Sequence, residues 1–530
     1  MPKNPHRPLA SNIISVNPFL RTEHLCTQQS QDRRQLRRNG VGLFVFFFLS
    51  GLFLVFYYLC RPERGLSILQ VGILCFILAG FVATRQFEID LLSPAFLMLL
   101  CFFCSYSIAP LYLVFCKGFS ISQPDIEKTM WFAIIFISFV LMGYFLKTGS
   151  RLARWLPVPP SDWKPRSVRV ILTVGVCFGL LGWLFILMTV GMSPLTQFLN
   201  VFQFRYRVFE IGGLYYVRNL VVWALWIAFW VPFLNYFLKQ DARRKTSTVI
   251  YLTIAFLTLT VFTYGFGQRL MVIAPIASLL FIANLSWRKL GFLPLVVAVV
   301  GFVWFARFYE NYRGLGWNRS DLLNLFSESA KFDRKSHVFL GHPVQQGEGL
   351  LDLLVFSAAR ITNAVDYTCE VVCYYPPPGY DFFYGRSYLY ALAGVFPRSM
   401  VGSLRAPFTD TFLTRISYMH PYMATGGTTD YGIAFGQISE LYINFREFGL
   451  LGGLLWGIFL RIVETYAEIH RKNPAVMLYY TCGFINLLTY CILLASFTSV
   501  NSINTVDLEF FLLFNTLLSV VLARTHFITS

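Results

Sequence analysis

Residues 41–60 read VGLFVFFFLSGLFLVFYYLC, a run that carries no charged side chain and is almost entirely apolar. The hydrocarbon core of a bilayer is roughly 30 Å thick and is crossed by about 20 apolar residues of α-helix. The run therefore predicts a membrane-spanning helix. Arg33, Arg34, Arg37 and Arg38 stand shortly before it, as expected for a helix whose start stays on the cytoplasmic side.

Similar apolar windows recur along the whole chain of 530 residues. Hydrophobic residues make up 56% of the chain and charged residues only 13%, a composition that excludes a soluble globular domain. We predict an all-α, polytopic membrane protein with about twelve transmembrane helices. The windows lie near 41–60, 66–84, 92–116, 130–146, 170–192, 214–238, 248–266, 270–286, 291–308, 436–460, 476–497 and 507–523.

The 44 Lys and Arg residues gather in alternate loops, which is the pattern of the positive-inside rule. It predicts that both termini are cytoplasmic. Attraction to anionic lipid headgroups accounts for the net charge of +17, so membrane lipids are expected partners and nucleic acid is not. The first apolar run has the length of a span and lacks a small-residue cleavage pattern, so no cleavable signal peptide is expected.

The windows and the charges divide the chain into five parts. We predict a basic cytoplasmic tail at 1–40, transmembrane helices at 41–308, an extracytoplasmic loop region with short helices at 309–431, further transmembrane helices at 432–523, and a cytoplasmic tail at 524–530.

The loop between Tyr309 and Tyr431 is predicted to carry the functional site, because polar loops held by a rigid scaffold commonly carry binding sites. Its later part contains arginine but no lysine. Guanidinium pairs bidentately with phosphate or carboxylate, so this choice favours an oxyanion-binding site. The arginines are Arg386, Arg398, Arg405 and Arg415.

Two other polar segments lie on the same side and are predicted to join the site. The stretch 198–218 presents Arg205 and Arg207, of which only one is expected to point inward because they alternate along the chain. The tight hairpin Gly265–Arg269 presents Arg269. A long arginine near an interface also extends toward the headgroups, so a purely structural role for Arg269 stays open.

Leu350–Tyr375 has the length and apolar content of a helix, but it carries too many charges for a span. We expect it to lie along the membrane surface or to pack on the bundle, and to end at the run Pro376–Gly379. Cys369 and Cys373 stand one helical turn apart within it. They predict a packed helix face rather than a disulfide or a metal site, because two further metal ligands are not near in sequence.

Two stretches carry a family resemblance. FYGRSYLYALAGVFPRSMVGSLRAPFTDTF, residues 383–412, and GQISELYINFREFGLLGGLLWGIFL, residues 436–460, resemble motifs of bacterial oligosaccharide repeat-unit polymerases. These are the Wzy-type O-antigen polymerases, polytopic glycosyltransferases of GT-C-like type. The hairpin Gly267–Arg269 and the span plan resemble that family as well. The chain departs from it at Arg405-Ala406, where the family shows Lys-Pro, and at Arg446-Glu447, which interrupts an Asn-Phe-Gly run and concerns local helix geometry.

The resemblance implies glycosyl transfer on the outer face of the bacterial inner membrane. The growing glycan moves from undecaprenyl pyrophosphate to the next lipid-linked repeat unit, so a lipid-linked oligosaccharide is the expected substrate and partner. A chain-length regulator is a further candidate partner. Positioned cations would stabilise the departing pyrophosphate. The residues predicted to bind it are Arg205, Arg207, Arg269, Arg386, Arg398, Arg405 and Arg415.

Attack on the anomeric carbon also calls for a base near the acceptor hydroxyl. The candidates are Glu440, His420, Asp410 and Asp430, and the sequence does not choose among them. No cofactor and no metal are expected, because neither a nucleotide-binding glycine-rich loop nor an HExxH motif is present.

Each residue also has a structural interpretation. The loop arginines could bridge backbone or lipid headgroups, His420 could be a loop hydrogen-bonding group, and Glu440 could form a buried structural pair. At the level of function the alternatives are an O-antigen ligase, which uses a similar donor with a different acceptor, and a flippase or other transporter of lipid-linked oligosaccharides. The first spans lack the midplane polar residues typical of a transporter.

Overall fold

The computed structural model describes residues 18–115, 122–159, 165–199, 214–238, 364–376, 381–386 and 437–480. Short pieces at 161, 163, 203–204, 207–208, 211, 250–260 (in part), 278–285, 289–301 (in part), 338–339 and 342–343 are described as well. The regular secondary structure of these parts is helical apart from one antiparallel pair of two-residue strands, β1 (Val338–Phe339) and β2 (His342–Pro343).

Six helical segments of the described chain are long and apolar enough to cross a membrane. They confirm an α-helical membrane protein, whereas the expected number of spans is not established. The segments are Ser30–Cys60, Ser67–Thr84, Gln123–Phe145, Arg166–Val190, Leu220–Leu238 and Gln437–Ile469. The windows near 248–266, 270–286, 291–308, 476–497 and 507–523 lie wholly or largely outside the described residues.

Helices α1 (Pro18–Cys60) and α2 (Ser67–Thr84) form an antiparallel hairpin closed by η1 (Pro62–Arg64). The two helices approach closely where Gly51 meets Gly72: a Cβ at Gly51 would lie 3.2 Å from the Gly72 carbonyl oxygen. Small residues allow such contact between membrane helices. Much of α1 is exposed and apolar, including Phe46, Phe53 and Phe56, which suits a helix with lipid on one side.

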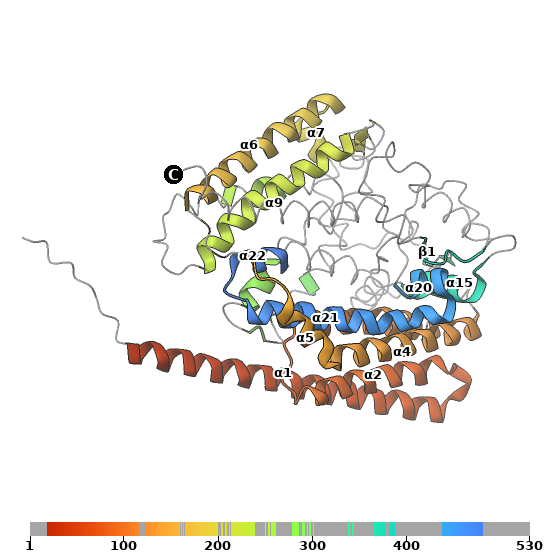
Figure 1. Ribbon diagram of the computed structural model, residues 1–530. Coiled ribbons are helices and arrows are strands. Elements are labelled where there is room, and N and C mark those ends of the chain that lie inside the picture. Colours follow the sequence, from red (N-terminus) through yellow and green to blue (C-terminus); the bar gives the residue numbers. More distant parts are fainter. Residues whose placement is uncertain are drawn as a thin grey trace, which may run out of the picture.

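A second group consists of α3 (Pro94–Phe115), α4 (Gln123–Phe145), α5 (Lys147–Trp155) and α21 (Gly452–Ile469). Ser122 caps α4 by accepting a hydrogen bond from the Asp125 backbone N–H, and Pro124 occupies the first turn. Leu146 has an extended backbone and separates α4 from α5. In Figure 1, α4 and α21 lie side by side, with the α1–α2 hairpin next to α4.

Helices α6 (Pro165–Val190) and α9 (Leu214–Leu238) form a separate antiparallel pair in Figure 1. Gly175 of α6 lies over Ala224 and Ala228 of α9, and Gly182 lies over Val221. The short α7 (Pro194–Leu199) follows α6. Helix α22 (Pro474–Leu478), which is capped by the Asn473 side chain, contacts α9 and so connects this pair to the chain that follows α21.

The window predicted at 436–460 lies within the candidate span Gln437–Ile469, but its helix is not regular throughout. The chain forms the short helix α20 (Gln437–Phe445), then the 3-10 helix η3 (Arg446–Leu451), and only then α21, which runs on to Ile469. The break occurs at Arg446, whose φ of 54° is left-handed. An α-helix cannot continue through that conformation. The interruption that Arg446-Glu447 makes in the sequence motif is thus a real change of helix geometry.

Helix α15 (Ala364–Tyr374) ends just before Pro376 and packs on α3, α4 and α20. The predicted stop is therefore confirmed at Pro376, and the described part of the predicted helix packs on the bundle, whereas its residues 350–363 lie outside the described residues. Cys369 is fully buried and Cys373 is half-buried, both as free thiols. The packed helix face predicted from their spacing is confirmed.

Candidate functional site

The two stretches that carry the resemblance meet in the structure. The backbone N–H of Phe383 donates to the carbonyl oxygen of Ile443 at 3.0 Å, and the N–H of Gly385 donates to Oδ1 of Asn444, also at 3.0 Å. The Asn444 amide in turn donates to the carbonyl of Glu440 at 2.8 Å. A buried asparagine on α20 thus holds the turn of the first motif against the helix of the second.

The turn itself has an unusual backbone. Tyr384 and Gly385 have φ angles of 49° and 83°, and the N–H of Arg386 donates back to the carbonyl of Phe383 at 3.0 Å. Glycine adopts the left-handed region without steric cost, whereas a tyrosine does so only when its surroundings enforce it. Tyr384, which is 69% exposed, and Arg386 are both exposed on this turn.

A second arginine is fixed beside this turn. The guanidinium of Arg446 stacks on the ring of Phe382, with its central carbon 4.3 Å from the ring centroid. Phe382 is buried and meets Tyr375 and Tyr442 edge-on. A cation held over an aromatic face keeps its charge and part of its hydrogen-bonding capacity. Arg446 is exposed, so it presents positive charge next to the segment that carries Arg386.

Beneath the turn lies a buried polar cluster made by three helices. The hydroxyl of Ser439 on α20 lies 3.0 Å from that of Thr368 on α15, which lies 3.0 Å from the hydroxyl of Tyr106 on α3. Glu440, next to Ser439, is only 4% exposed. A carboxyl at that depth in the first turn of a helix is favoured by the helix dipole. The burial is compatible with both interpretations of Glu440, as a base and as a structural group.

Helix α15 is tied to the start of α4 by polar contacts at the same end of the bundle. Lys128 donates to the carbonyl of Val372 at 3.0 Å, and the Tyr374 hydroxyl donates to the Asp125 carboxylate at 2.7 Å. The hydrogen bond to Asp125 raises the pKa of Tyr374 to about 12, because the carboxylate favours the protonated phenol. The hydrogen bond to Cys373, together with burial, raises the pKa of the Cys369 thiol.

Of the other predicted site residues, the structure describes Arg207. Its guanidinium donates to the carbonyl of Val190 at 3.2 Å, at the C-terminal end of α6. Cations are favoured there because the last carbonyls of a helix lack partners. Arg207 therefore has at least a structural role. Those that lie outside the described residues are Arg205, Arg269, Arg398, Arg405, Arg415, Asp410, His420 and Asp430.

Sequence reasoning missed several residues of this site. Asn444 and Arg446 were seen only as parts of a motif, and Thr368, Ser439 and Tyr106 were not singled out. A signal for Asn444 exists, because an amide within a run of apolar residues needs a partner when buried. Arg218, at 1% exposure near the start of α9, was also missed as an individual residue.

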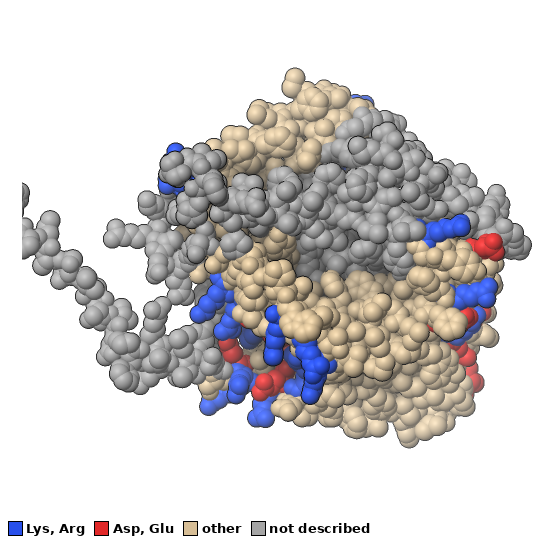
Figure 2. Space-filling view, viewed as in Figure 1, with Lys and Arg blue, Asp and Glu red and all other residues tan. Residues whose placement is uncertain are grey.

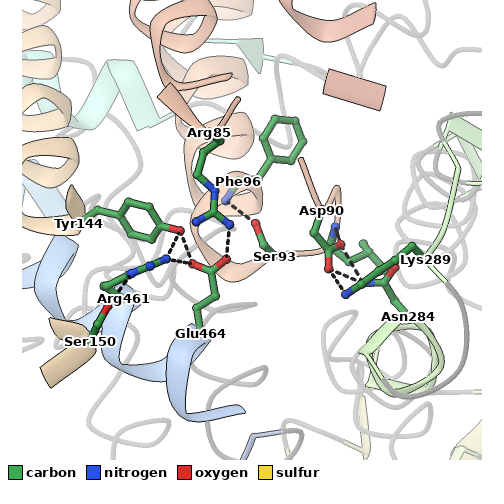
Figure 3. Close-up of polar contacts among 11 residues, drawn as sticks. Arg85, Asp90, Ser93, Phe96, Tyr144, Ser150, Asn284, Lys289, Arg461 and Glu464 are labelled. Atoms are coloured by element: carbon green, nitrogen blue, oxygen red, sulfur yellow. Dashed lines mark hydrogen bonds and ion pairs between the residues drawn. The ribbon is translucent and has the colours of Figure 1, made fainter. Parts of the chain in front are cut away.

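The opposite end of the bundle holds a second polar cluster, shown in Figure 3. Glu464 of α21, 4% exposed, pairs with Arg85 at 3.3 Å and with Arg461 at 3.7 Å and accepts a hydrogen bond from Tyr144. Burial alone would lower the pKa of Arg85. The negative charge of the neighbouring carboxylates, Glu464 first among them, outweighs this effect and raises the pKa.

A second ion pair lies next to that cluster. Asp90 pairs with Lys289 at 2.5 Å and accepts hydrogen bonds from the Asn284 amide at 2.8 and 3.0 Å. The pair ties the chain after α2 to the described piece at 289–291.

Charged side chains gather at two ends of the described surface, separated by a broad uncharged belt (Figure 2). Apolar helices between two charged rims define the class of this chain as an α-helical, membrane-embedded protein. Comparison with family models, with curated proteins and with solved structures gives no match. Within the described residues, no group of three or more His, Cys, Asp or Glu side chains is arranged to hold a metal ion.

Proposed function

We propose that this protein is a membrane glycosyltransferase that polymerises oligosaccharide repeat units. In this proposal the donor is a glycan on undecaprenyl pyrophosphate, the acceptor is the next lipid-linked unit, and the reaction takes place on the outer face of the bacterial inner membrane. The observation that carries the proposal is the pairing of Gly385 with Asn444. It joins the two stretches on which the resemblance to repeat-unit polymerases rests.

The chemistry needs negative charge to be stabilised as the pyrophosphate leaves. The acceptor hydroxyl attacks the anomeric carbon, the bond from that carbon to the pyrophosphate oxygen breaks, and a base takes the hydroxyl proton. Arg386 and Arg446 are exposed on adjoining segments and supply fixed positive charge without a risk of deprotonation. Arg269, Arg398, Arg405 and Arg415 are proposed to complete the pyrophosphate site.

The proposed base is one of Glu440, His420 and Asp410. Glu440 stands nearest in the chain to Asn444 and is buried, at 4% exposure. If Glu440 is the base, rotation or opening of the Phe383–Arg386 turn would have to admit the acceptor hydroxyl to it. If it is structural, the base comes from the loop that carries Asp410 and His420.

Reconstitution tests the reaction directly. The purified protein is supplied with lipid-linked repeat units in vesicles, and the products are separated on a gel. We expect a ladder of longer lipid-linked chains. Transfer to a different acceptor alone would favour the ligase, and movement of the lipid-linked unit across the bilayer without new glycosidic bonds would favour the transporter and refute the enzyme.

Substitution of Arg386 tests the site. Arg386→Ala should lower the rate of chain extension by about 10²- to 10³-fold, the usual effect of removing one group that stabilises a developing negative charge. Arg398→Ala and Arg405→Ala should each abolish the ladder with expression intact. The matched control is Arg61→Ala, because Arg61 is exposed and paired only loosely with Glu63 at 3.7 Å. A wild-type rate for Arg386→Ala would remove this residue from the proposed site.

A further inference from the structure

Helix α5 has one face that is firmly held by the bundle. Gly149 and Ala153 are buried, and a Cβ at Gly149 would lie 2.8 Å from the Cβ of Arg461 on α21. On the same side, Nε of Arg461 donates to the hydroxyl of Ser150 at 3.0 Å. The inner face of α5 is therefore a close helix–helix contact that fixes the orientation of the whole helix.

The chain after α5 is held from the same side. The Tyr466 hydroxyl donates to the carbonyl of Pro157 at 2.7 Å, and the Asn473 amide donates to the carbonyl of Pro159 at 2.8 Å. Both donors belong to the end of α21 or to the cap of α22. The outer face of α5 consequently points in a defined direction, away from these contacts.

That outer face is divided into two sectors. At about 100° per residue, Lys147, Arg151 and Arg154 fall within a sector about 60° wide. Leu152 and Trp155 fall within a neighbouring sector of about 60°. All five are exposed, and Trp155 is 81% exposed. The helix contains no acidic residue.

The position of α5 relative to the spans indicates where these sectors lie in the membrane. The helix starts at Lys147, and only Leu146 separates it from the candidate span Gln123–Phe145. Figure 2 shows Lys and Arg side chains gathered at this end of the described surface, where the uncharged belt stops. A basic sector beside an aromatic and aliphatic sector at this depth is the arrangement of a helix that lies in the membrane interface.

We propose that the outer face of α5 is a binding site for the headgroup of an anionic phospholipid. Arg151 and Arg154 pair with the phosphate of the headgroup, Lys147 adds charge, and Trp155 and Leu152 lie against the glycerol backbone and upper acyl region. Guanidinium matches phosphate geometry, and tryptophan favours the interface. The site is independent of the glycosyltransferase proposal, which concerns the opposite end of the bundle.

A lipid bound to α5 would be linked to the rest of the bundle through Ser150. Ser150 of α5 accepts from Arg461, which lies 3.2 Å from the Tyr144 hydroxyl and pairs with Glu464. A lipid that holds α5 in place therefore also stabilises the polar cluster that joins α2, α4 and α21. Anionic lipid should protect this end of the protein against unfolding more than neutral lipid does.

Quenching of tryptophan fluorescence tests the site in the full-length protein. The protein is placed in nanodiscs of phosphatidylcholine in which a small fraction of the lipid is brominated, either as phosphatidylglycerol or as phosphatidylcholine. The chain has 11 Trp residues, so the signal of Trp155 is the difference between the wild type and Trp155→Phe. We expect brominated phosphatidylglycerol to quench this difference signal at a much lower fraction than brominated phosphatidylcholine.

Two double variants distinguish a specific lipid-binding site on α5 from general electrostatic attraction of the protein to anionic lipid. Near an anionic leaflet each arginine contributes about fivefold in affinity, so R151Q/R154Q should weaken the preference for phosphatidylglycerol roughly 25-fold. The matched control is R37Q/R38Q, which removes equal charge from the exposed arginines of α1 and should keep the preference. Equal quenching by the two lipids in the wild type would overturn the proposal, and so would an equal loss in both double variants.

Discussion

At the scale of single residues, Asn444 organises the candidate site. Its carboxamide accepts from Gly385 and donates to the carbonyl of Glu440, so both halves of the amide are used. A hydrophobic side chain of the same size would remove the acceptor of the partly buried Gly385 N–H, and an unsatisfied donor of this kind costs about 1–3 kcal/mol. Asn444 thus supports the turn that carries Tyr384 and Arg386, together with the backbone hydrogen bond from Phe383 to Ile443.

We predict that Asn444→Leu lowers both thermal stability and chain extension. Gly385→Ala should disturb the same turn from the other side, because its φ of 83° is unfavourable for alanine by about 1–2 kcal/mol. If the two act through one turn, the double variant should be less damaging than the sum of the single variants. Additive losses in a double-mutant cycle of unfolding free energies would show that the contact does not couple them.

The hydrogen bond of Tyr374 should make the stability of the folded protein depend on pH. Its hydrogen bond to Asp125 raises the phenol pKa from the ordinary 10 to about 12 in the folded state. The folded state therefore favours the neutral phenol, and this stabilisation is complete below pH 10 and lost as pH rises from about 10 to about 12. The unfolding temperature of the wild type should fall faster in that range than that of Tyr374→Phe. Parallel curves for the two proteins would contradict the assignment.

At the scale of elements, glycine decides how closely the helices approach. Gly143 of α4 and Gly457 of α21 lie directly against the backbone of the partner helix, and Gly453 lies against Phe136. The sequence placed 436–460 in one span, and the structure has the candidate span Gln437–Ile469 there, with a change of helix geometry inside it. At Arg446 the helix changes geometry through a left-handed backbone, and the guanidinium stacks on Phe382. The hydropathy of the sequence predicts neither feature.

We predict that Gly457→Ala destabilises the protein by several kcal/mol, on the order of a severe overpacking substitution. A Cβ at this position would collide with the carbonyl oxygen of Val140 and with the backbone nitrogen of Tyr144. The matched control is Gly80→Ala in α2, where a Cβ meets nothing within 4 Å; there alanine should be neutral or stabilising by up to about 1 kcal/mol. Thermal unfolding in detergent measures both. Equal stability of the two variants would contradict the close helix contact.

At the scale of the whole molecule, the Glu464 cluster connects three helices that are distant in the chain. Arg85 follows α2, Tyr144 belongs to α4, and Glu464 and Arg461 belong to α21. A buried ion pair adds little net stability compared with a hydrophobic contact, but removal of one partner leaves a buried charge uncompensated. The cluster thus defines how these helices are positioned relative to one another.

We predict that Glu464→Leu lowers the free energy of unfolding by about 3–5 kcal/mol, because Arg85 and Arg461 lose their buried carboxylate. The comparison variant is Glu63→Leu, which removes the carboxylate of the exposed pair with Arg61 and should change stability by less than about 1 kcal/mol. Chemical denaturation in one detergent compares them. A loss for Glu464→Leu no larger than that for Glu63→Leu would mean that the cluster does not hold the bundle together.

The sequence by itself determined the class of the protein, several helix positions and the end of α15. These follow from hydropathy, from the charge of the loops and from proline. Each is a local property of the sequence, whose effect on a helix does not depend on residues distant in the chain. Only the tertiary structure decided that the turn at Gly385 lies on Asn444, that the helix changes geometry at Arg446, and that Arg85 meets Glu464. Those contacts join residues far apart in the chain, and their geometry depends on how the helices pack.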